Sequence, residues 1–263
     1  MIAIALRIIA GLVIVYLAVG FLLFAMQSRL IYPASQEVFA PDLGLQPVTL
    51  ETSDGLELNA HWRPADEGQP TIVWFHGNGG TLRGATAETI IVRDAGYGAL
   101  LVSYRGYGGN PGTPGEEGFY RDGRAAMAFL EKQGVSLDQT VLIGNSIGSG
   151  TATQMAREFD PAALILIAPF TSLPDVANDA LPMYPAQWLM RDRFDNQEKL
   201  AKLSLPTLVL HGQADQVVPF AHGKTLGEFD HVAFQAFDAF GHELSFTRAA
   251  QEAQLGWLRS QGL

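Results

Sequence analysis

Five short apolar runs constrain the fold of this chain more than any other feature. They are TIVWFHG from residue 71, GALLVSYRG from 98, TVLIGNS from 140, AALILIAPF from 162 and PTLVLHG from 206. Each is too short for an ordinary helix and lacks alternation, which is typical of strands buried on both faces. Amphipathic stretches at 81–95, 115–133 and 148–159 separate them. This rhythm predicts an α/β fold with a mostly parallel sheet and helices on both faces.

A hairpin is expected to precede the parallel part of the sheet. Residues 48–62, VTLETSDGLELNAHW, alternate apolar and polar side chains on both sides of Asp54-Gly55. Period-two patterning around an Asp-Gly turn predicts two antiparallel strands. In open sheets of this class, functional groups lie beyond the carboxyl ends of the strands. We therefore look for the site where the apolar runs end.

The N-terminal segment predicts a membrane anchor. Residues 8–26 carry no charge, and such a helix roughly matches the ~30 Å hydrocarbon layer. A cleaved signal peptide is the alternative, but the stretch exceeds a usual signal core and no A-x-A cleavage site follows. A core helix is the third possibility, although it should show one polar face. We expect an anchor at 1–29, a linker at 30–47 and the α/β domain at 48–263.

Charge and composition limit the partners. Arg7 and Arg29 flank the apolar segment almost evenly, and we expect the N-terminus in the cytoplasm with the domain on the non-cytoplasmic side. The formal net charge is −10 and no basic run is present, which argues against nucleic-acid binding. The chain has no cysteine, so disulfides, zinc–thiolate sites and cysteine nucleophiles are excluded.

The region at about 171–203 interrupts the alternation of strands and helices. It contains three prolines and several large apolar side chains between two predicted strands. We interpret it as a small cap over the carboxyl edge of the sheet, because insertions of this length are frequently functional. An ordinary crossover helix with a long loop remains the alternative.

The motif Gly144-Asn145-Ser146-Ile147-Gly148 predicts the nucleophile. A serine between small residues at a sharp strand-to-helix turn can project its hydroxyl outward, although Gly-x-Ser-x-Gly also occurs by chance. The hydroxyl needs a base, and among six histidines only His242 directly follows the last predicted strand. Asp215 follows the strand before it and could orient the imidazole.

Each of these residues also has an ordinary structural interpretation. Asp215 could be a helix N-cap, and His242 could be a cap or packing residue. Their joint placement favours catalysis, because Ser146, Asp215 and His242 each follow a different strand, in the chain order serine, acid, histidine that catalytic sets on this type of sheet use. We therefore predict these three as the catalytic set.

Stabilisation of an oxyanion should come from two backbone amides. HGNGG, residues 76–80, ends the first parallel strand with glycines that let the backbone approach a substrate. We predict that the amides of Asn78 and Ile147 donate to the developing oxyanion. His76 is interpreted as a structural hydrogen-bonding residue. This chemistry needs no metal and no organic cofactor.

Taken together, these motifs resemble the α/β-hydrolase fold. The segments are VWFHGNGG, the stretch from Leu101 that contains YRGYGGNPG, LIGNSIGSG, APFTSLPDVA, LVLHGQADQVVP and GHEL. They are most similar to small serine hydrolases with one N-terminal membrane anchor, a group that includes acyl-protein thioesterases and lysophospholipid or monoacylglycerol lipases. The resemblance implies Ser146 as nucleophile, Asp215 as acid, His242 as base, and Asn78 and Ile147 as oxyanion donors. The loop Tyr104 to Gly112 is assigned a structural role.

The expected function is hydrolysis of carboxylic esters or thioesters with an apolar acyl chain, at or near a membrane. The cap is the stretch least like the family, so the resemblance does not define the substrate. Two alternatives stay open. One is an amidase or peptidase with the same residues, and the other is a catalytically silent, membrane-bound scaffold.

Overall fold

The computed structural model describes residues 1–263, and its centre is one eight-stranded sheet with the order β1-β2-β4-β3-β5-β6-β7-β8. The predicted hairpin is confirmed: β1 (Gln46–Glu51) pairs antiparallel with β2 (Glu57–Arg63). Strand β2 then pairs antiparallel with β4. The hairpin therefore extends the edge of the parallel region.

The apolar runs form parallel strands at the centre of the sheet, as predicted. Every residue of β3 to β7 is buried, because helices cover both faces. Strand β8 closes the far edge and pairs parallel with β7. The bounds are β3 Thr71–Phe75, β4 Gly98–Val102, β5 Thr140–Asn145, β6 Ala163–Ile167, β7 Thr207–Gly212 and β8 Val232–Phe237.

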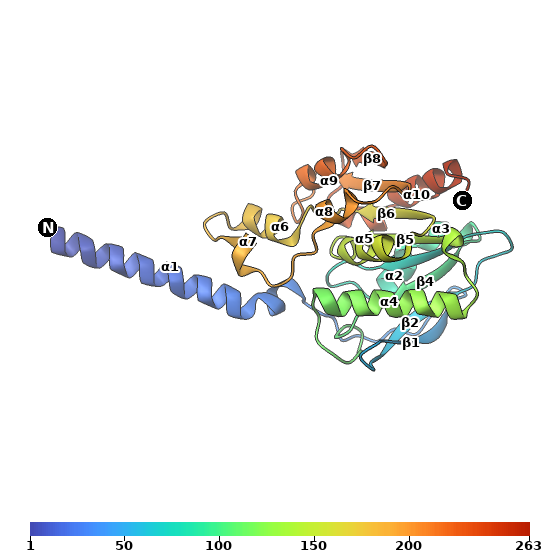
Figure 1. Ribbon diagram of the computed structural model, residues 1–263, viewed down its shortest axis with the longest axis horizontal. Coiled ribbons are helices and arrows are strands. Elements are labelled where there is room, and N and C mark those ends of the chain that lie inside the picture. The colour runs from blue at the N-terminus through green and yellow to red at the C-terminus, as the bar shows by residue number, and fades with distance from the viewer.

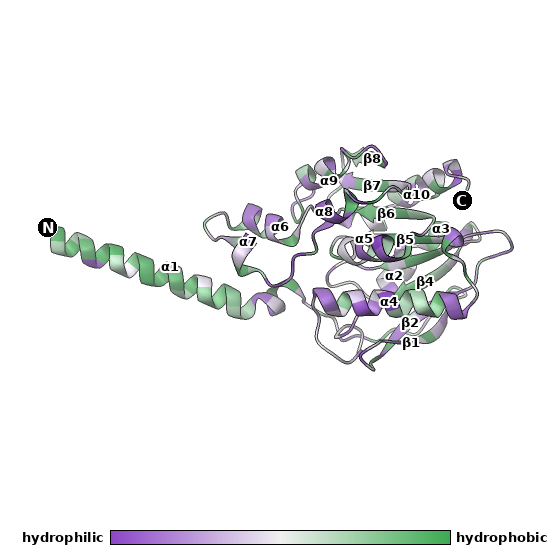
Figure 2. Ribbon diagram, viewed as in Figure 1, coloured by the Kyte–Doolittle hydropathy of each residue, from purple (hydrophilic) through white to green (hydrophobic).

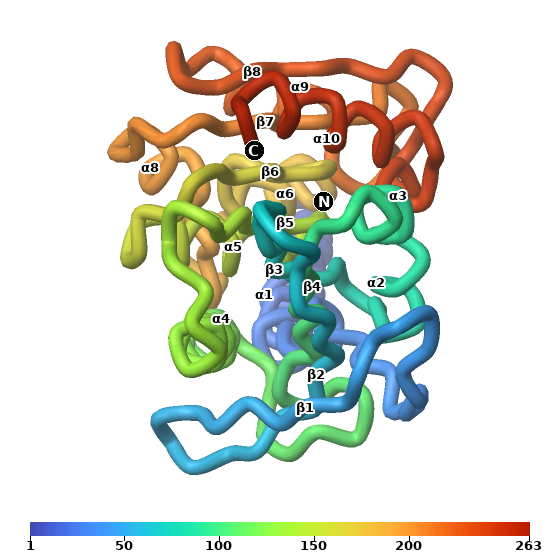
Figure 3. Tube along the Cα trace, turned by 90° about the vertical axis from the view of Figure 1, so that its right-hand side faces the viewer, coloured from blue at the N-terminus to red at the C-terminus, as the bar shows by residue number.

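Two apolar cores sandwich the sheet, and the pleat distributes side chains between them. In β3, Val73 and Phe75 join one core while Ile72 and Trp74 join the other. The first core is covered by α4 (Glu116–Lys132), α5 (Gly148–Phe159) and α9 (Phe220–Leu226); the second by α2 (Leu82–Glu88), α3 (Ile90–Asp94) and α10 (Arg248–Ser260). Figure 3 shows α4 and α5 on one side of the strands, with α2 and α3 on the other. The predicted helix over 81–95 is two helices, which meet at Thr89.

Helix α1 (Ile2–Ile31) extends away from the sheet domain (Figure 1). It is apolar over most of its length, as Figure 2 shows, and is long enough to cross a membrane. Its side chains are largely exposed and only Gln27 is buried. The core-helix alternative is therefore wrong. The helix continues two residues past the predicted end of the anchor, to Ile31.

The region between β6 and β7 is part cap and part crossover. Helices α6 (Leu173–Ala180) and α7 (Ala186–Leu189) lie beside the second half of α1, whereas α8 (Asn196–Leu200) packs on α5 (Figure 1). Asn196 fixes α8 to the domain, because its side-chain amide donates to Ser149 Oγ and to the Phe170 carbonyl oxygen. We use "cap" below for residues 173–191.

Candidate active site

A sharp turn between β5 and α5 places Ser146 at the carboxyl edge of the sheet. Ser146 has a left-handed backbone with φ of 51°, a conformation that costs a non-glycine residue about 1–3 kcal/mol. Glycine is required on both sides of it. A Cβ at Gly148 would overlap the Phe75 carbonyl oxygen, and one at Gly144 would lie 2.6 Å from the Ser149 Cα. The small residues of the motif therefore let α5 begin directly against β3 and β5.

The three predicted catalytic side chains form one hydrogen-bonded chain. The Ser146 Oγ lies 2.9 Å from His242 Nε2, and His242 Nδ1 lies 2.8 Å from Asp215 Oδ2. In the tautomer with hydrogen on Nδ1, the imidazole donates to the carboxylate and its Nε2 accepts the serine proton. Ser146 follows β5, Asp215 follows β7, and His242 opens a short 3₁₀ helix (His242–Phe246) after β8. The arrangement can activate a hydroxyl as a nucleophile.

The carboxylate of Asp215 is held in place and kept ionised. Its Oδ1 accepts hydrogen bonds from the amides of Val217 and Val218, at 2.8 and 2.9 Å. Burial alone would raise the pKa of Asp215, but hydrogen bonds from His211 and His242 and the charge of His242 hold that pKa below its ordinary value. The negative charge is therefore available to stabilise an imidazolium at His242.

The two predicted oxyanion donors, Asn78 and Ile147, belong to the cleft that holds Ser146. The amides of Asn78 and Ile147 make no hydrogen bond to another backbone group, and both residues line the cleft that holds Ser146 and His242. The side chain of Asn78 is also fixed, since its amide donates to the Ile31 carbonyl oxygen and its Oδ1 accepts from Tyr107 Oη at 2.8 Å. Two free amides beside a nucleophile can bind a developing negative charge.

The cleft in front of Ser146 is mainly apolar and has a volume of about 590 Å³. Eleven of its fourteen lining residues are hydrophobic. Nine of these eleven come from the end of α1, from the cap and from the loop after β7, and they include Leu30, Ile31, Leu173, Val176, Met190 and Val217. No group of three or more His, Asp or Glu side chains is placed to hold a metal ion. The cleft suits an apolar substrate portion next to a polar reacting group.

Comparisons with known proteins agree with this architecture. A sequence model of the alpha/beta hydrolase fold matches residues 70–198. The uncharacterised protein Rv2307c of Mycobacterium tuberculosis is 34% identical over 222 residues, which cover 82% of this chain and 79% of that protein. The chain belongs to the α/β-hydrolase family. Membership supports a hydrolase as its general activity.

Two further relatives extend this comparison. The lysophosphatidylserine lipase ABHD12 of Danio rerio is 30% identical over 212 residues, covering 72% of this chain and 54% of that protein. The solved structure of the Pyrococcus furiosus esterase PF2001 superposes with a TM-score of 0.69 at 15% identity, covering 88% of this chain and 99% of that one. The second likeness shows the hydrolase fold, and the first shows that lipid-cleaving family members share sequence with this chain.

His76 has the structural environment that the sequence analysis expected. It is buried between Tyr104 and Tyr107, and its Nδ1 lies 2.7 Å from the Gly77 carbonyl oxygen. Burial lowers the pKa of His76 to about 4, so the ring is neutral at physiological pH. It makes no hydrogen bond to Ser146.

A buried carboxyl behind the nucleophile was not predicted from the sequence. Glu88 Oε1 accepts from Asn145 Nδ2 at 3.1 Å and from Ser245 Oγ at 2.6 Å. Asn145 precedes the nucleophile, and Ser245 lies three residues after His242. Glu88 therefore connects the serine turn to the histidine loop within the hydrolase core. Neighbouring residues in the sequence give no signal for it, since the partners are 57 and 157 positions away.

Proposed function

We propose that this protein is a membrane-anchored serine hydrolase that cleaves carboxylic esters or thioesters with an apolar acyl chain. One observation carries the proposal: Ser146, His242 and Asp215 form a hydrogen-bonded chain that opens on an apolar cleft beside two free amides. The nucleophile, base, orienting carboxylate and oxyanion donors of acyl transfer are thus within reach of one carbonyl group.

The reaction follows from this geometry in two halves. Ser146 Oγ attacks the carbonyl carbon while its proton moves to His242 Nε2, and the resulting oxyanion accepts hydrogen bonds from the amides of Asn78 and Ile147. The alcohol or thiol leaves with the proton from the imidazolium, which gives an acyl-serine. A water molecule, deprotonated by His242, then attacks the acyl carbon. The carboxylic acid is released and the Ser146 hydroxyl is restored.

The membrane location of the substrate is part of the proposal. Helix α1 has the length and hydropathy of a membrane span, and its last turn lines the reactive cleft. The name of the relative from Danio rerio is that of a lysophosphatidylserine lipase, which supports a lipid-like ester as the substrate. We place the catalytic domain on the non-cytoplasmic side of the membrane. Because the chain has no cysteine, labelling of a Ser260→Cys variant by an impermeant maleimide in intact cells tests this orientation.

The decisive experiment replaces the nucleophile. Purified protein in detergent is assayed against ester, thioester and amide substrates, and labelled with a fluorophosphonate probe. We expect Ser146→Ala to abolish both turnover and labelling, while Ser260→Ala, an exposed serine at the end of α10, leaves both unchanged. Turnover or labelling that survives in Ser146→Ala would refute the nucleophile assignment. Turnover of amides but not of esters would show that the enzyme is an amidase and would refute the proposed ester or thioester substrate.

A further inference from the structure

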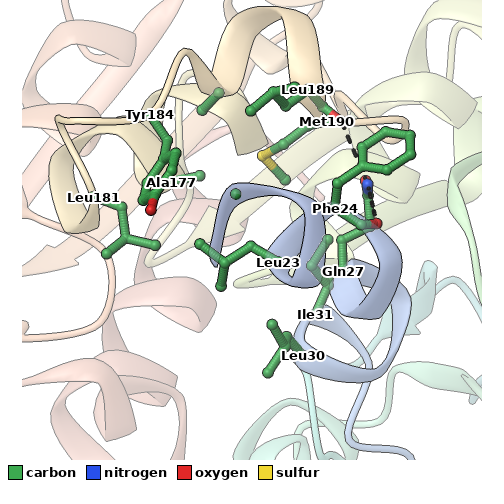
Figure 4. Close-up of a pocket in the computed structure, with 12 residues that line it drawn as sticks. Leu23, Phe24, Gln27, Leu30, Ile31, Ala177, Leu181, Tyr184, Leu189 and Met190 are labelled. Atoms are coloured by element: carbon green, nitrogen blue, oxygen red, sulfur yellow. Dashed lines mark hydrogen bonds between the residues drawn. The ribbon is translucent and has the colours of Figure 1, made fainter. Parts of the chain in front are cut away.

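The reactive cleft adjoins a second cavity that the proposed reaction does not itself require. This cavity, about 180 Å³, lies between α1 and the cap and is shown in Figure 4. It shares four wall residues with the cleft around Ser146: Leu30, Ile31, Ala177 and Met190. The two cavities therefore lie side by side. Together their linings form a continuous apolar surface from the side of the membrane helix to the cleft that holds the nucleophile.

The lining of this α1–cap groove is almost entirely apolar. Ten of its twelve residues are hydrophobic, and Leu23 and Phe24 of α1 face Tyr184 and Leu189 of the cap (Figure 4). Along α1 it extends from Gly20 to Ile31, which corresponds to about 16 Å at 1.5 Å per residue. A narrow apolar groove of this length suits an extended hydrocarbon chain and offers nothing to a polar substrate.

Polar contacts fix the width of the groove. Gln27 Nε2 donates to the Leu189 carbonyl oxygen at 3.3 Å, and its Oε1 accepts from the Arg191 amide at 2.9 Å. Further along α1, the Tyr16 and Tyr184 rings stack with centroids 4.7 Å apart. At Gly20 a Cβ would lie 3.0 Å from the Tyr184 ring. The cap is therefore held against α1 at the Gly20 end of the groove and again at Gln27.

The cap contacts the part of α1 that is apolar enough for the bilayer. Tyr16 and Phe24, which both contact cap residues, belong to the uncharged stretch of residues 8–26. Trp188 and Met183 at the tip of the cap are 87% and 65% exposed. Exposed tryptophan beside a membrane helix is typical of the membrane–water interface. With α1 inserted in a bilayer, the groove would therefore lie next to lipid, close to the membrane–water interface.

We propose that the α1–cap groove binds the acyl chain of a lipid ester that enters sideways from the membrane leaflet, with its carbonyl group at Ser146. The inference rests on the proposed function and makes α1 part of the substrate site as well as an anchor. The shared lining identifies the occupant. An acyl chain in the groove would extend past Ala177 and Met190, which also line the cleft that holds the nucleophile.

The test compares two neighbouring leucines of α1. Leu23 lines the groove, whereas Leu22 is 55% exposed and lines neither the groove nor the cleft. Leu23→Trp should fill the groove, and Leu22→Trp adds the same side chain to the same helix without doing so. We expect Leu23→Trp to lower kcat/KM for p-nitrophenyl palmitate in phosphatidylcholine vesicles by about tenfold or more, because an acyl chain excluded from the groove no longer holds the carbonyl group in place at Ser146. Turnover of p-nitrophenyl acetate should not change.

A variant in the cap wall of the groove tests the same inference independently. Ala186→Trp, in the cap wall of the groove and outside the cleft around Ser146, should produce the same loss for the long ester alone, and Ala128→Trp, at an exposed site on α4, should produce none. If Leu23→Trp and Ala186→Trp hydrolyse palmitate and acetate esters in the wild-type ratio, the chain does not use the groove and the inference is wrong.

A binding measurement separates this inference from the proposed reaction. A photoreactive long-chain ester in phosphatidylcholine vesicles should crosslink to residues 20–31 and 173–190 in the wild type and in Ser146→Ala, and this crosslinking should be lost in Leu23→Trp. Crosslinks at these residues without ester turnover would support the groove and refute the proposed reaction. Turnover of long esters with crosslinks confined elsewhere would support the reaction and refute the groove.

Discussion

Replacement of Glu88 by glutamine tests whether a buried carboxyl beside the nucleophile makes folding depend on pH. Glu88 is only 3% exposed, and its Oε1 accepts from Asn145 and Ser245. Burial raises the pKa of Glu88 from 4.5 to about 7, although the two hydrogen bonds partly oppose this shift. No basic side chain forms an ion pair with it. Between about pH 4.5 and about pH 7, Glu88 in the folded protein therefore keeps a proton that the same residue in the unfolded chain has released.

The sign of the effect follows from this difference in proton binding. Because the folded-state pKa lies above the unfolded one, the stabilisation by the bound proton is complete below about pH 4.5 and is lost as the pH rises to about 7. At about 1.4 kcal/mol per pKa unit, the two values correspond to a loss of about 3 kcal/mol in the free energy of unfolding. Glu88→Gln keeps an oxygen acceptor and removes the titration.

The assay is urea unfolding in detergent at a series of pH values from about 4.5 to about 8. We expect the free energy of unfolding of the wild type to fall relative to that of Glu88→Gln by about 3 kcal/mol across this range. Glu131→Gln, at an exposed site on α4, should follow the wild type. Parallel curves for the wild type and Glu88→Gln would refute the reasoning, because they would mean that Glu88 has the same pKa in both states.

Three further predictions concern packing, a buried ion pair and catalysis. In thermal unfolding, Gly148→Ala should lower the free energy of unfolding by about 3 kcal/mol, because a Cβ there would overlap a β3 carbonyl oxygen. Gly256→Ala, which has open space around it, should be neutral or slightly stabilising in the same measurement. Asp122→Ala removes the fully buried carboxylate partner of Arg105 and leaves its guanidinium paired with the partly exposed Asp54 alone, so it should cost about 3 kcal/mol in urea unfolding. A cost no larger than that of an exposed substitution would contradict this role. Asp215→Asn should reduce kcat for ester hydrolysis by about 10⁴-fold with the fold intact by circular dichroism, and a loss below tenfold would show that the imidazole is oriented by another group.

The sequence was sufficient to predict the sheet, because the apolar runs that indicate its strands are local features of the chain. Runs such as TIVWF and ALILI place apolar side chains on both pleat faces, so each can only be a strand covered on both sides. The same holds for the serine turn. Gly144 and Gly148 are required by close backbone contacts within one strand–turn–helix unit, and a unit of this kind can be inferred from its own residues.

The single helix predicted over 81–95 shows where local patterns give too coarse an answer. Its apolar spacing continues through the whole segment, but the chain turns at Thr89, between α2 and α3. The division lets Glu88 point inward to Asn145 and Ser245 while Val92 packs in the core. Hydrophobic spacing fixes which face of a helix is buried, but not where it breaks to reach a partner.

By itself, the sequence determined the α/β class, the apolar span at the N-terminus and the order in which Ser146, Asp215 and His242 follow their strands, because periodicity and order are properties of the chain. Only the tertiary structure decided that Asn78 is held by the end of α1 and that α1 and the cap form a groove leading to Ser146. These contacts join residues about 50 to 170 positions apart. Their formation depends on how α1 leaves the domain and how the cap packs against it, and no repeat or spacing in the sequence encodes that geometry.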